Sequence, residues 1–361
     1  MSAYYRHRYH GLSLIELMIA LSIGTLLALG VMSVFLANRE SSVVESALSR
    51  VQQSGRAAVE LVNKDIRRAG YIGCSSIGGR ADVAATGFTA QRLTAYTRGS
   101  TAATLAPSVA TGDPAYVLRD VVRPGTDILV VDYADYFGND LVAAGAAISG
   151  VNTSFSLASA DNKACGLAAG DLLLLSNCLT THIFRLDSAS ACSSGSTTVT
   201  LTSSENAGAG AAVPFLYEQG SDVAEYFEFL WYVADTGRDQ NGQDVFALYR
   251  LASNQPVSAA QEMVEGVEFF RVEVGERVGN ALRFAAPGAA GIDWDNIEAV
   301  RFAMLVQSFD AATESVDTAS YQLLSNQVPA TGTVSHGGGR VVRRVYTSSQ
   351  TIRNTEYGRQ Q

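Results

Sequence analysis

The chain has 361 residues, of which 47% are hydrophobic and only 17% are charged, and its formal net charge is −9. High hydrophobicity with a charged fraction below the ~25% typical of soluble domains excludes a fully disordered chain. The net negative charge argues against a nucleic-acid binder that neutralises phosphates. Because the sequence has only one long apolar run, a polytopic membrane protein is excluded as well.

The amino terminus combines a short basic segment with a long apolar one. Arg6 and Arg8 come first, residues 17–37 carry no charge, and Glu16 is the only charged side chain from Leu12 to Asn38. As a helix, residues 17–37 would span about 30 Å, the thickness of a bilayer core. The positive-inside rule keeps the basic end in the cytoplasm and places the chain beyond Asn38 across the membrane.

Three interpretations of this segment compete. A secretory signal peptide would have an apolar region of about 7–15 residues and a cleavage site of small residues, and this longer run lacks such a site. A single-pass anchor fits the length but does not explain Glu16, because a carboxylate inside an apolar helix is costly and is functional by default. The third interpretation rests on Gly11, the apolar stretch after it and Glu16 five residues later, which together resemble the class III signal of type IV prepilins.

The resemblance implies processing and assembly. In that family a prepilin peptidase cuts directly after the glycine, here between Gly11 and Leu12, and the new amino terminus is methylated, here at Leu12. Leu12 stands where the family most often has phenylalanine. Removal of 11 residues from 361 leaves 350, and the loss of Arg6 and Arg8 changes the net charge from −9 to −11. Related pilins pair the glutamate with the amine of a neighbouring subunit, so the resemblance assigns assembly to Glu16.

The helical pattern continues beyond the apolar run. Small or apolar residues recur at spacings of three and four, which describes one face of a helix. They are Val44, Leu48, Val51, Gly55, Ala58, Val62, Ile66 and Ala69. With Gly70 as its stop, the pattern predicts one helix over about residues 12–69, with a transmembrane part at 12–38 and an amphipathic part at 39–70. A free coiled coil is the alternative, but the few large residues on this face favour packing on a sheet.

The end of this helix narrows the resemblance. Residues 65–74 read DIRRAGYIGC, which resembles the PilW-type minor pilins and the related J-type pseudopilins of type II secretion. Further segments match the PilW pattern in order, at residues 126–131, 248–250, 264–268, 297–301 and 351–354. Residues 81–118 and 135–164 look like insertions.

After Cys74 the sequence changes to short apolar runs between connections rich in Gly, Ser, Thr and Asp, a pattern typical of antiparallel β structure. Candidate strands are residues 116–118, 126–133, 171–176, 182–186, 197–202, 212–218, 223–233, 245–251, 263–274, 297–306 and 340–346. Asn241-Gly242 predicts a hairpin turn within residues 235–244, and residues 99–112 predict a surface loop. Residues 316–339 contain clusters of Ser, Thr and Gly and end in a predicted glycine-rich turn at residues 336–339. The predicted fold is α+β and pilin-like: a long amino-terminal helix packed on an antiparallel, β-sheet-rich globular domain at residues 71–361.

The four cysteines, Cys74, Cys165, Cys178 and Cys192, all follow the membrane segment. In a periplasmic setting an even number suggests two disulfides, and of the three possible pairings we favour Cys178–Cys192 with Cys74–Cys165. A zinc site is the alternative, but no C-x-x-C spacing supports it, and His182 is expected to be a strand residue. A calcium site in residues 235–244 lacks the EF-hand order of ligands, so a hairpin loop is favoured there. No metal and no cofactor are predicted.

Signatures of enzymes are absent, including G-x-S-x-G, H-E-x-x-H and the phosphate-binding glycine loops. The processed chain keeps His182 and His336 as its histidines. Arg340, Arg343 and Arg344 cluster near the carboxyl terminus. We interpret them as a charged strand face, with contact to an acidic partner as the alternative.

These observations predict a structural assembly protein rather than an enzyme: a minor pilin that primes the type IV pilus with other minor pilins and sits at or near its tip. Expected partners are the prepilin peptidase, other minor pilins and the major pilin through the amino-terminal helix, and a tip adhesin, but no nucleic acid. The expected location is the bacterial inner membrane, with a periplasmic carboxyl-terminal domain, and then the pilus, which serves adhesion and twitching motility. The alternatives are a J-type pseudopilin, for which 350 residues is long, and a single-pass anchored periplasmic binding protein or enzyme.

Overall fold

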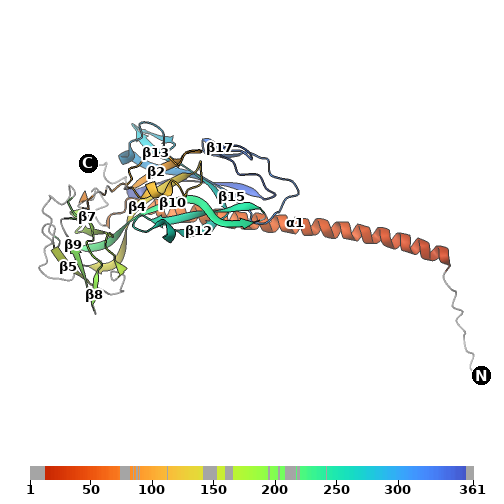
Figure 1. Ribbon diagram of the computed structural model, residues 1–361, viewed down its shortest axis with the longest axis horizontal. Helices are drawn as coiled ribbons and strands as arrows, with labels where there is room; N and C mark the ends of the chain where they lie inside the picture. The colour runs from red at the N-terminus through yellow and green to blue at the C-terminus, as the bar shows by residue number, and fades with distance from the viewer. Residues whose placement is uncertain are drawn as a thin grey trace, which may run out of the picture.

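A long helix projects from a β-sheet-rich domain in the computed structural model of the chain (Figure 1). The structure describes residues 13–73, 82–83, 85–86, 88, 90–111, 113–140, 153–158, 166–193, 196–201, 204–207, 217, 220–240 and 242–354. The helix α1 (Leu14–Arg68) packs against the domain with its carboxyl-terminal part, and its amino-terminal part extends away from it. This arrangement confirms the predicted α+β, pilin-like fold.

Local signals set both ends of α1. At the start, the Glu16 backbone N–H donates to Ser13 Oγ (3.2 Å) and the Ser13 N–H donates to Glu16 Oε2 (3.4 Å), so the two residues form a capping box. At the end, Arg67 and Arg68 complement the helix dipole. Gly70 follows with φ of +71°, and its N–H donates to the Asp132 carbonyl oxygen at 2.8 Å. The observed bounds therefore agree closely with the helix predicted over residues 12–69.

The main sheet has the strand order β1-β7-β6-β10-β4-β2-β3, and β11 and β12 continue it beside the second half of β10. All described pairs in this sheet are antiparallel except β1 with β7. The strands are β1 (Asp82–Val83), β2 (Leu93–Arg98), β3 (Leu105–Ala106), β4 (Asp127–Asp140), β6 (Leu172–Ser176), β7 (Thr181–Arg185), β10 (Asp222–Gln240), β11 (Gln243–Ala252) and β12 (Gln261–Glu265).

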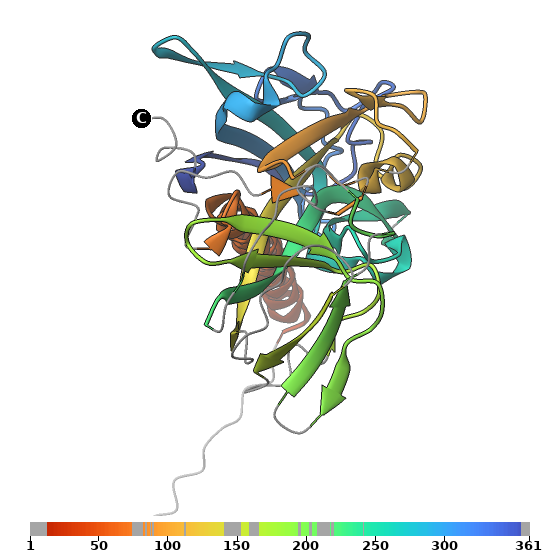
Figure 2. The same ribbon diagram turned by 90° about the vertical axis from the view of Figure 1, so that its left-hand side faces the viewer.

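A second sheet has the order β14-β13-β15-β18, and smaller sheets flank the two larger ones. Its strands are β13 (Val267–Val278), β14 (Ala281–Ala285), β15 (Ile297–Gln307) and β18 (Arg343–Thr351). One smaller sheet consists of β5 (Thr153–Ala158), β9 (Ser196–Leu201) and β8 (Ala191–Ser193), in that order. The other consists of β16 (Tyr321–Leu323) and β17 (Asn326–Val328). Figure 2 shows these layers around α1, seen along the helix from the far end of the domain.

The largest core cluster lies between α1 and the two larger sheets. Val51, Ala58, Val62 and Ile66 of the helix are buried against residues of β4, β10, β13 and β15. These four belong to the face predicted from the apolar spacing, so the prediction that the helix packs on sheet rather than forming a free coiled coil is confirmed. Gly55 lies where α1 crosses β18, and a Cβ at this position would overlap the ring of Tyr346. A glycine is therefore needed for this close approach.

Some elements differ from the predicted ones. Residues 116–118 belong to a short helix, α2 (Pro114–Leu118), and not to a strand, because Asp113 caps the Ala115 N–H at 2.7 Å and Pro114 favours the first helical turn. The predicted strand at 263–274 is divided into β12 and β13 by Gly266, which has a φ of +85°. The loop predicted at residues 99–112 contains β3, the segment 316–339 contains β16 and β17, and β2 lies in the first of the two segments interpreted as insertions. The candidate at 212–218 falls largely outside the described residues.

Candidate functional site: the exposed helix and its anchor

The amino-terminal half of α1 is an apolar rod that no other part of the described chain covers. Residues 14–43 are all exposed, including Leu17, Leu27 and Phe35 at 51%, 66% and 62%. Among the described helices, α1 alone is long and apolar enough to cross a membrane. An exposed apolar surface of this size is stable only in a bilayer or against other apolar surfaces.

Glu16 lies in the first turn of this rod. Its Oε2 accepts the Ser13 N–H in the capping box, and within the described part of the chain it has no cationic partner. The capping box was missed in the sequence, although Ser13 followed by Glu16 three residues later is its usual signature. The proposed cleavage and methylation positions, Gly11 and Leu12, lie outside the described residues.

The opposite end of α1 is anchored by a buried carboxylate. Asp65 is 4% exposed and lies beside the apolar face of the helix. Its Oδ1 accepts the Tyr133 hydroxyl at 3.0 Å, and its Oδ2 accepts Trp231 Nε1 at 3.0 Å and Arg250 Nε at 2.9 Å. Three donors from β4, β10 and β11 thus converge on one carboxylate of α1, so its charge is neutralised and hydrogen-bonded where it is buried.

Arg250 and Arg68 extend this network around Tyr133. Arg250 also donates to the Tyr133 hydroxyl oxygen at 2.7 Å, and its guanidinium lies 3.4 Å from the centroid of the Phe229 ring. Arg68 lies 4.2 Å from the Tyr133 centroid and pairs with Asp135 at 2.5 Å. Burial and then the charge of Asp65 raise the pKa of Tyr133, so its hydroxyl remains a donor. We call Asp65, Tyr133, Trp231 and Arg250 the anchor.

The anchor joins two segments that lie far apart in the sequence. Asp65 belongs to the segment DIRRAGYIGC and Arg250 to the segment Leu248-Tyr249-Arg250, and 185 residues separate the two. Both segments carried the resemblance to PilW-type pilins, but their contact was not predicted. Tyr133 and Trp231 were missed as well, since each lies in a strand whose partner cannot be read locally. The one local signal was a carboxylate beside the buried face of an amphipathic helix.

The cysteines and histidines are structural in the described residues. Cys178 is disulfide-bonded and has a φ of +66°, while the side chains of Cys74, Cys165 and Cys192 lie outside the described part of the chain, so the pairing stays a prediction. His182 is a buried strand residue of β7, as predicted, with Nδ1 2.7 Å from the Tyr217 hydroxyl. Where the structure describes the chain, no three His, Cys, Asp or Glu side chains are grouped to hold a metal ion.

The hairpin at residues 235–244 has the expected turn. Gln240 pairs with Gln243, so the two strands come together on either side of the predicted turn, of which Asn241 lies outside the described residues. The carboxylates of Asp235 and Asp239 accept the N–H groups of Gly237 and Gly242, both at 2.9 Å. These two side chains therefore stabilise the hairpin.

The carboxyl-terminal arginines do not form one charged face. The side chain of Arg343 is fully buried, and it donates to Glu268 Oε2 at 2.6 Å and to Asp317 Oδ2 at 3.1 Å. Arg340 donates to the Thr313 carbonyl oxygen at 2.8 Å, and Arg344 is exposed. The interpretation as a charged strand face is therefore wrong for Arg343, because it lies within the core of the second sheet with carboxylates of its own chain.

Comparison with known proteins identifies both ends of the chain. Residues 6–32 match the family described as the prokaryotic N-terminal methylation motif, which includes Gly11, Leu12 and Glu16. Residues 231–354 match the family described as type IV pilus-assembly protein W, PilW. No curated protein and no solved structure matches the chain. The PilW match begins at Trp231 and includes Arg250, two of the anchor residues, together with the whole second sheet.

Both families are structural components of pili. Their matches occur on one chain, whose exposed apolar helix begins within the methylation motif and leads to a β-rich domain. These features describe a membrane-anchored, pilus-associated protein that interacts with prepilin peptidase and with other pilins. The similarity of residues 231–354 to the PilW family and the methylation motif at residues 6–32 together support a PilW-type minor pilin of the type IV pilus.

Proposed function

We propose that the protein primes assembly of the type IV pilus together with other minor pilins and remains at or near the filament tip. The observation that carries this proposal is the apolar rod, residues 14–43 of α1, in which every residue is exposed and Glu16 is the one charge before Arg39. Before assembly, the lipid bilayer would cover the apolar surface of the rod. In a filament, the apolar helices of neighbouring subunits would cover it instead.

Processing prepares the rod for this role. In the proposal, prepilin peptidase removes residues 1–11, Leu12 becomes the methylated amino terminus, residues 12–38 span the inner membrane and residues 71–361 lie in the periplasm. The positive amine at Leu12 then pairs with Glu16 of a neighbouring subunit. The capping box supports this pairing, because Ser13 holds Oε2 of Glu16 and fixes the carboxylate at the start of the helix. An unpaired charge among packed apolar helices would be costly.

The size of the globular domain supports a position at the end of the filament. The two larger sheets pack against the buried face of only the carboxyl-terminal half of α1 (Figure 1). A subunit at the tip is packed by neighbours on one side only, so its domain is less restricted than that of a subunit within the filament. A tip position would also leave the far end of the domain available to an adhesin.

The substitution Glu16→Ala tests the assembly role. We expect the variant chain to be cut and inserted at the normal level, but the number of pili on the cells to fall at least tenfold, because the amine of the neighbour loses its partner. Immunoblots of membrane fractions measure processing, and electron microscopy counts the pili. Ser13→Ala is the matched control, since it removes the cap, worth about 1 kcal/mol, but keeps the carboxylate. Normal piliation of the Glu16→Ala cells would contradict the role.

The tip position has its own test. Immunogold labelling of sheared pili with antibodies against the globular domain should place gold at one end of each filament. Labelling distributed along the filaments would contradict the tip position without affecting the assembly role of Glu16.

A further inference from the structure

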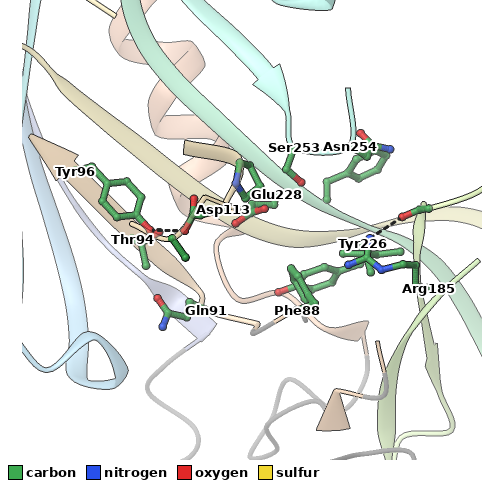
Figure 3. A pocket seen from close by; sticks show the side chains of 15 residues that line it. Phe88, Gln91, Thr94, Tyr96, Asp113, Arg185, Tyr226, Glu228, Ser253 and Asn254 are labelled. Atoms are coloured by element: carbon green, nitrogen blue, oxygen red, sulfur yellow. Dashed lines mark hydrogen bonds between the residues drawn. The ribbon is translucent and has the colours of Figure 1, made fainter. Parts of the chain in front are cut away.

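A polar cavity lies on the face of the main sheet that is turned away from α1. Side chains of β10 alternate between the two faces, as in any strand. Trp231 belongs to the core beneath the helix, whereas Tyr226 and Glu228 line the cavity on the other side. Its volume is about 540 Å³, within the roughly 300–1,000 Å³ typical of ligand sites. Figure 3 shows its side chains, which come from the segment before β2, from β2, from the start of α2 and from β7, β10 and the loop after β11.

Two aromatic rings form one wall of the cavity. Phe88 and Tyr226 lie edge to face, with their centroids 5.8 Å apart. Tyr226 is only 4% exposed, yet its hydroxyl has no hydrogen-bond partner among the described residues and points into the cavity (Figure 3). Although the residue as a whole is buried, its hydroxyl oxygen is not among the buried polar atoms that lack a partner, so it opens onto the cavity. There it can exchange a hydrogen bond with a ligand or with solvent.

Some polar side chains of the cavity are occupied by the protein itself. Asp113 accepts the Tyr96 hydroxyl at 3.1 Å and the Ala115 N–H at 2.7 Å, and Arg185 donates to the Gly170 carbonyl oxygen at 3.1 Å. Other groups keep free capacity within the described structure. The side-chain amide of Gln91 lines the cavity without a protein partner, and Asn254 uses only its Nδ2, which donates to Asp171 at 2.6 Å. The free groups thus include donors and acceptors.

The charge of the cavity is nearly balanced at neutral pH. Glu228 faces Asp132 across the β10–β4 ladder, so two carboxylates are direct neighbours. Burial and then the charge of Asp113 raise the pKa of Glu228 to about 7, against the lowering effects of Ser253 and Arg185. Burial and then Glu228 raise the pKa of Asp132 well above its usual range. Both groups therefore retain protons more readily than exposed carboxylates, and Arg185 balances part of the remaining charge.

We propose that this cavity binds a neutral saccharide of one or two rings. A sugar presents an apolar ring face, which fits the aromatic wall of Phe88 and Tyr226, and many hydroxyls, which both donate and accept. The Tyr226 hydroxyl and the Gln91 amide donate to the sugar, while Asn254 Oδ1 and Glu228 accept from it. The cavity faces away from α1, so a bound sugar does not obstruct packing of the apolar rod in a membrane or a filament.

Ligand-observed saturation-transfer NMR on the full chain tests the proposal. The protein is kept in a detergent without a sugar headgroup, because alkyl glycosides would occupy the site. The neutral probes are glucose, galactose, mannose, N-acetylglucosamine and lactose, and the charged probes are glucosamine, putrescine and N-acetylneuraminic acid. We expect at least one neutral sugar to bind and none of the charged probes to bind more tightly.

Three variants localise the binding. Tyr226→Phe and Gln91→Ala each remove one donor and should weaken binding of that sugar by roughly three- to tenfold. Glu262→Gln, an exposed carboxylate on β12 outside the cavity, is the matched control and should leave binding unchanged. Unfolding midpoints confirm that each variant is folded. The proposal is overturned if no neutral sugar binds, if a charged probe binds more tightly, or if the cavity variants bind as the control does.

Discussion

At the scale of single residues, Asp65 and Glu16 show how the same type of side chain serves two purposes. Asp65 is buried and receives three donors, one of them the cation of Arg250. Glu16 is exposed at the other end of the same helix, where its protein contacts are with the cap residue Ser13. The first carboxylate is satisfied within its own chain and is therefore structural, whereas the second remains available to another subunit.

The variant Asp65→Asn tests the anchor. Substitution keeps the shape but removes the charge, so Arg250, whose side chain is 21% exposed, is left largely buried without its anion. We expect the free energy of unfolding to fall by about 3 kcal/mol, as for other buried pairs that lose one partner. Urea unfolding of the full chain in detergent, followed by fluorescence, measures the change.

Asp135→Asn is the matched control for this prediction. Asp135 pairs with Arg68, but its side chain is 54% exposed, and pairs of this kind contribute about 0–1 kcal/mol. If both substitutions lowered the free energy of unfolding equally, the buried anchor would contribute no more to stability than an exposed ion pair.

Residues with local signals were the ones that the sequence predicted. Glu16 stood out because it is isolated in an apolar run, and Gly70 because it follows the last turn of a periodic helix. The anchor had no such signal, since Asp65 and Arg250 are 185 residues apart and only strand pairing brings them together. The cavity could not be predicted for the same reason, because the residues that line it come from six separate segments of the chain.

At the scale of elements, β10 connects the two halves of the domain and both faces of the main sheet. Its first half pairs with β6 and β4, and its second half pairs with β11. The acidic residues Glu225 and Glu228 lie near other carboxylates, which makes the sheet sensitive to pH. Burial and then Asp171 and Asp135 raise the pKa of Glu225 to about 7, as burial does for Glu228.

This arrangement predicts a stability that falls as pH rises from about 5 to 8. In this window the folded chain retains protons on Glu225 and Glu228 that the unfolded chain, with a glutamate pKa near 4.3, has already lost. The free energy of unfolding should therefore decrease by roughly 1–3 kcal/mol over the window. Glu273 and Asp317, whose pKa values are lowered, act in the opposite sense only at more acidic pH.

Urea midpoints at pH 5, 6, 7 and 8 measure this dependence, and Glu228→Gln should flatten it. A midpoint that rises with pH, or a variant with the same slope as the unmodified chain, would contradict the assigned cause.

Helices and strands could be predicted where a segment has one clear pattern of apolar residues. The pattern of apolar runs located β6, β7, β9, β11 and β15 to within a few residues. It also located β4 and β10 but underestimated the length of both strands. The short helix α2 was predicted as a strand, because three apolar residues carry no period and the cap at Asp113 was overlooked. The order of strands in the sheets was not accessible, since it depends on pairing between distant segments.

At the scale of the whole molecule, the protein is a rod and a domain that are joined by one helix. Residues 14–43 of α1 are exposed, and burial begins near Ala47 and continues to Ile66 (Figure 1). The rod is thus specialised for membrane and partners, and the second half of the helix is part of the core of the domain.

Two truncations test this division. A chain that lacks residues 1–38 should keep its free energy of unfolding within roughly 0.5 kcal/mol and should remain monomeric without detergent, because the described residues that it loses are all exposed. A chain that lacks residues 1–57 should lose at least about 2 kcal/mol, since it also loses buried Val51 and the crossing at Gly55. Unfolding of the first chain at markedly lower urea would show that the rod supports the domain.

The central claim is that this chain is a processed pilin, and the mass and sequence of the mature amino terminus test it most directly. Mass spectrometry of the protein isolated from membranes or pili should find a chain that begins at Leu12 and carries one additional methyl group on its amine. A mature protein that retains residues 1–11 would contradict the account and would return the chain to the class of uncleaved single-pass anchors.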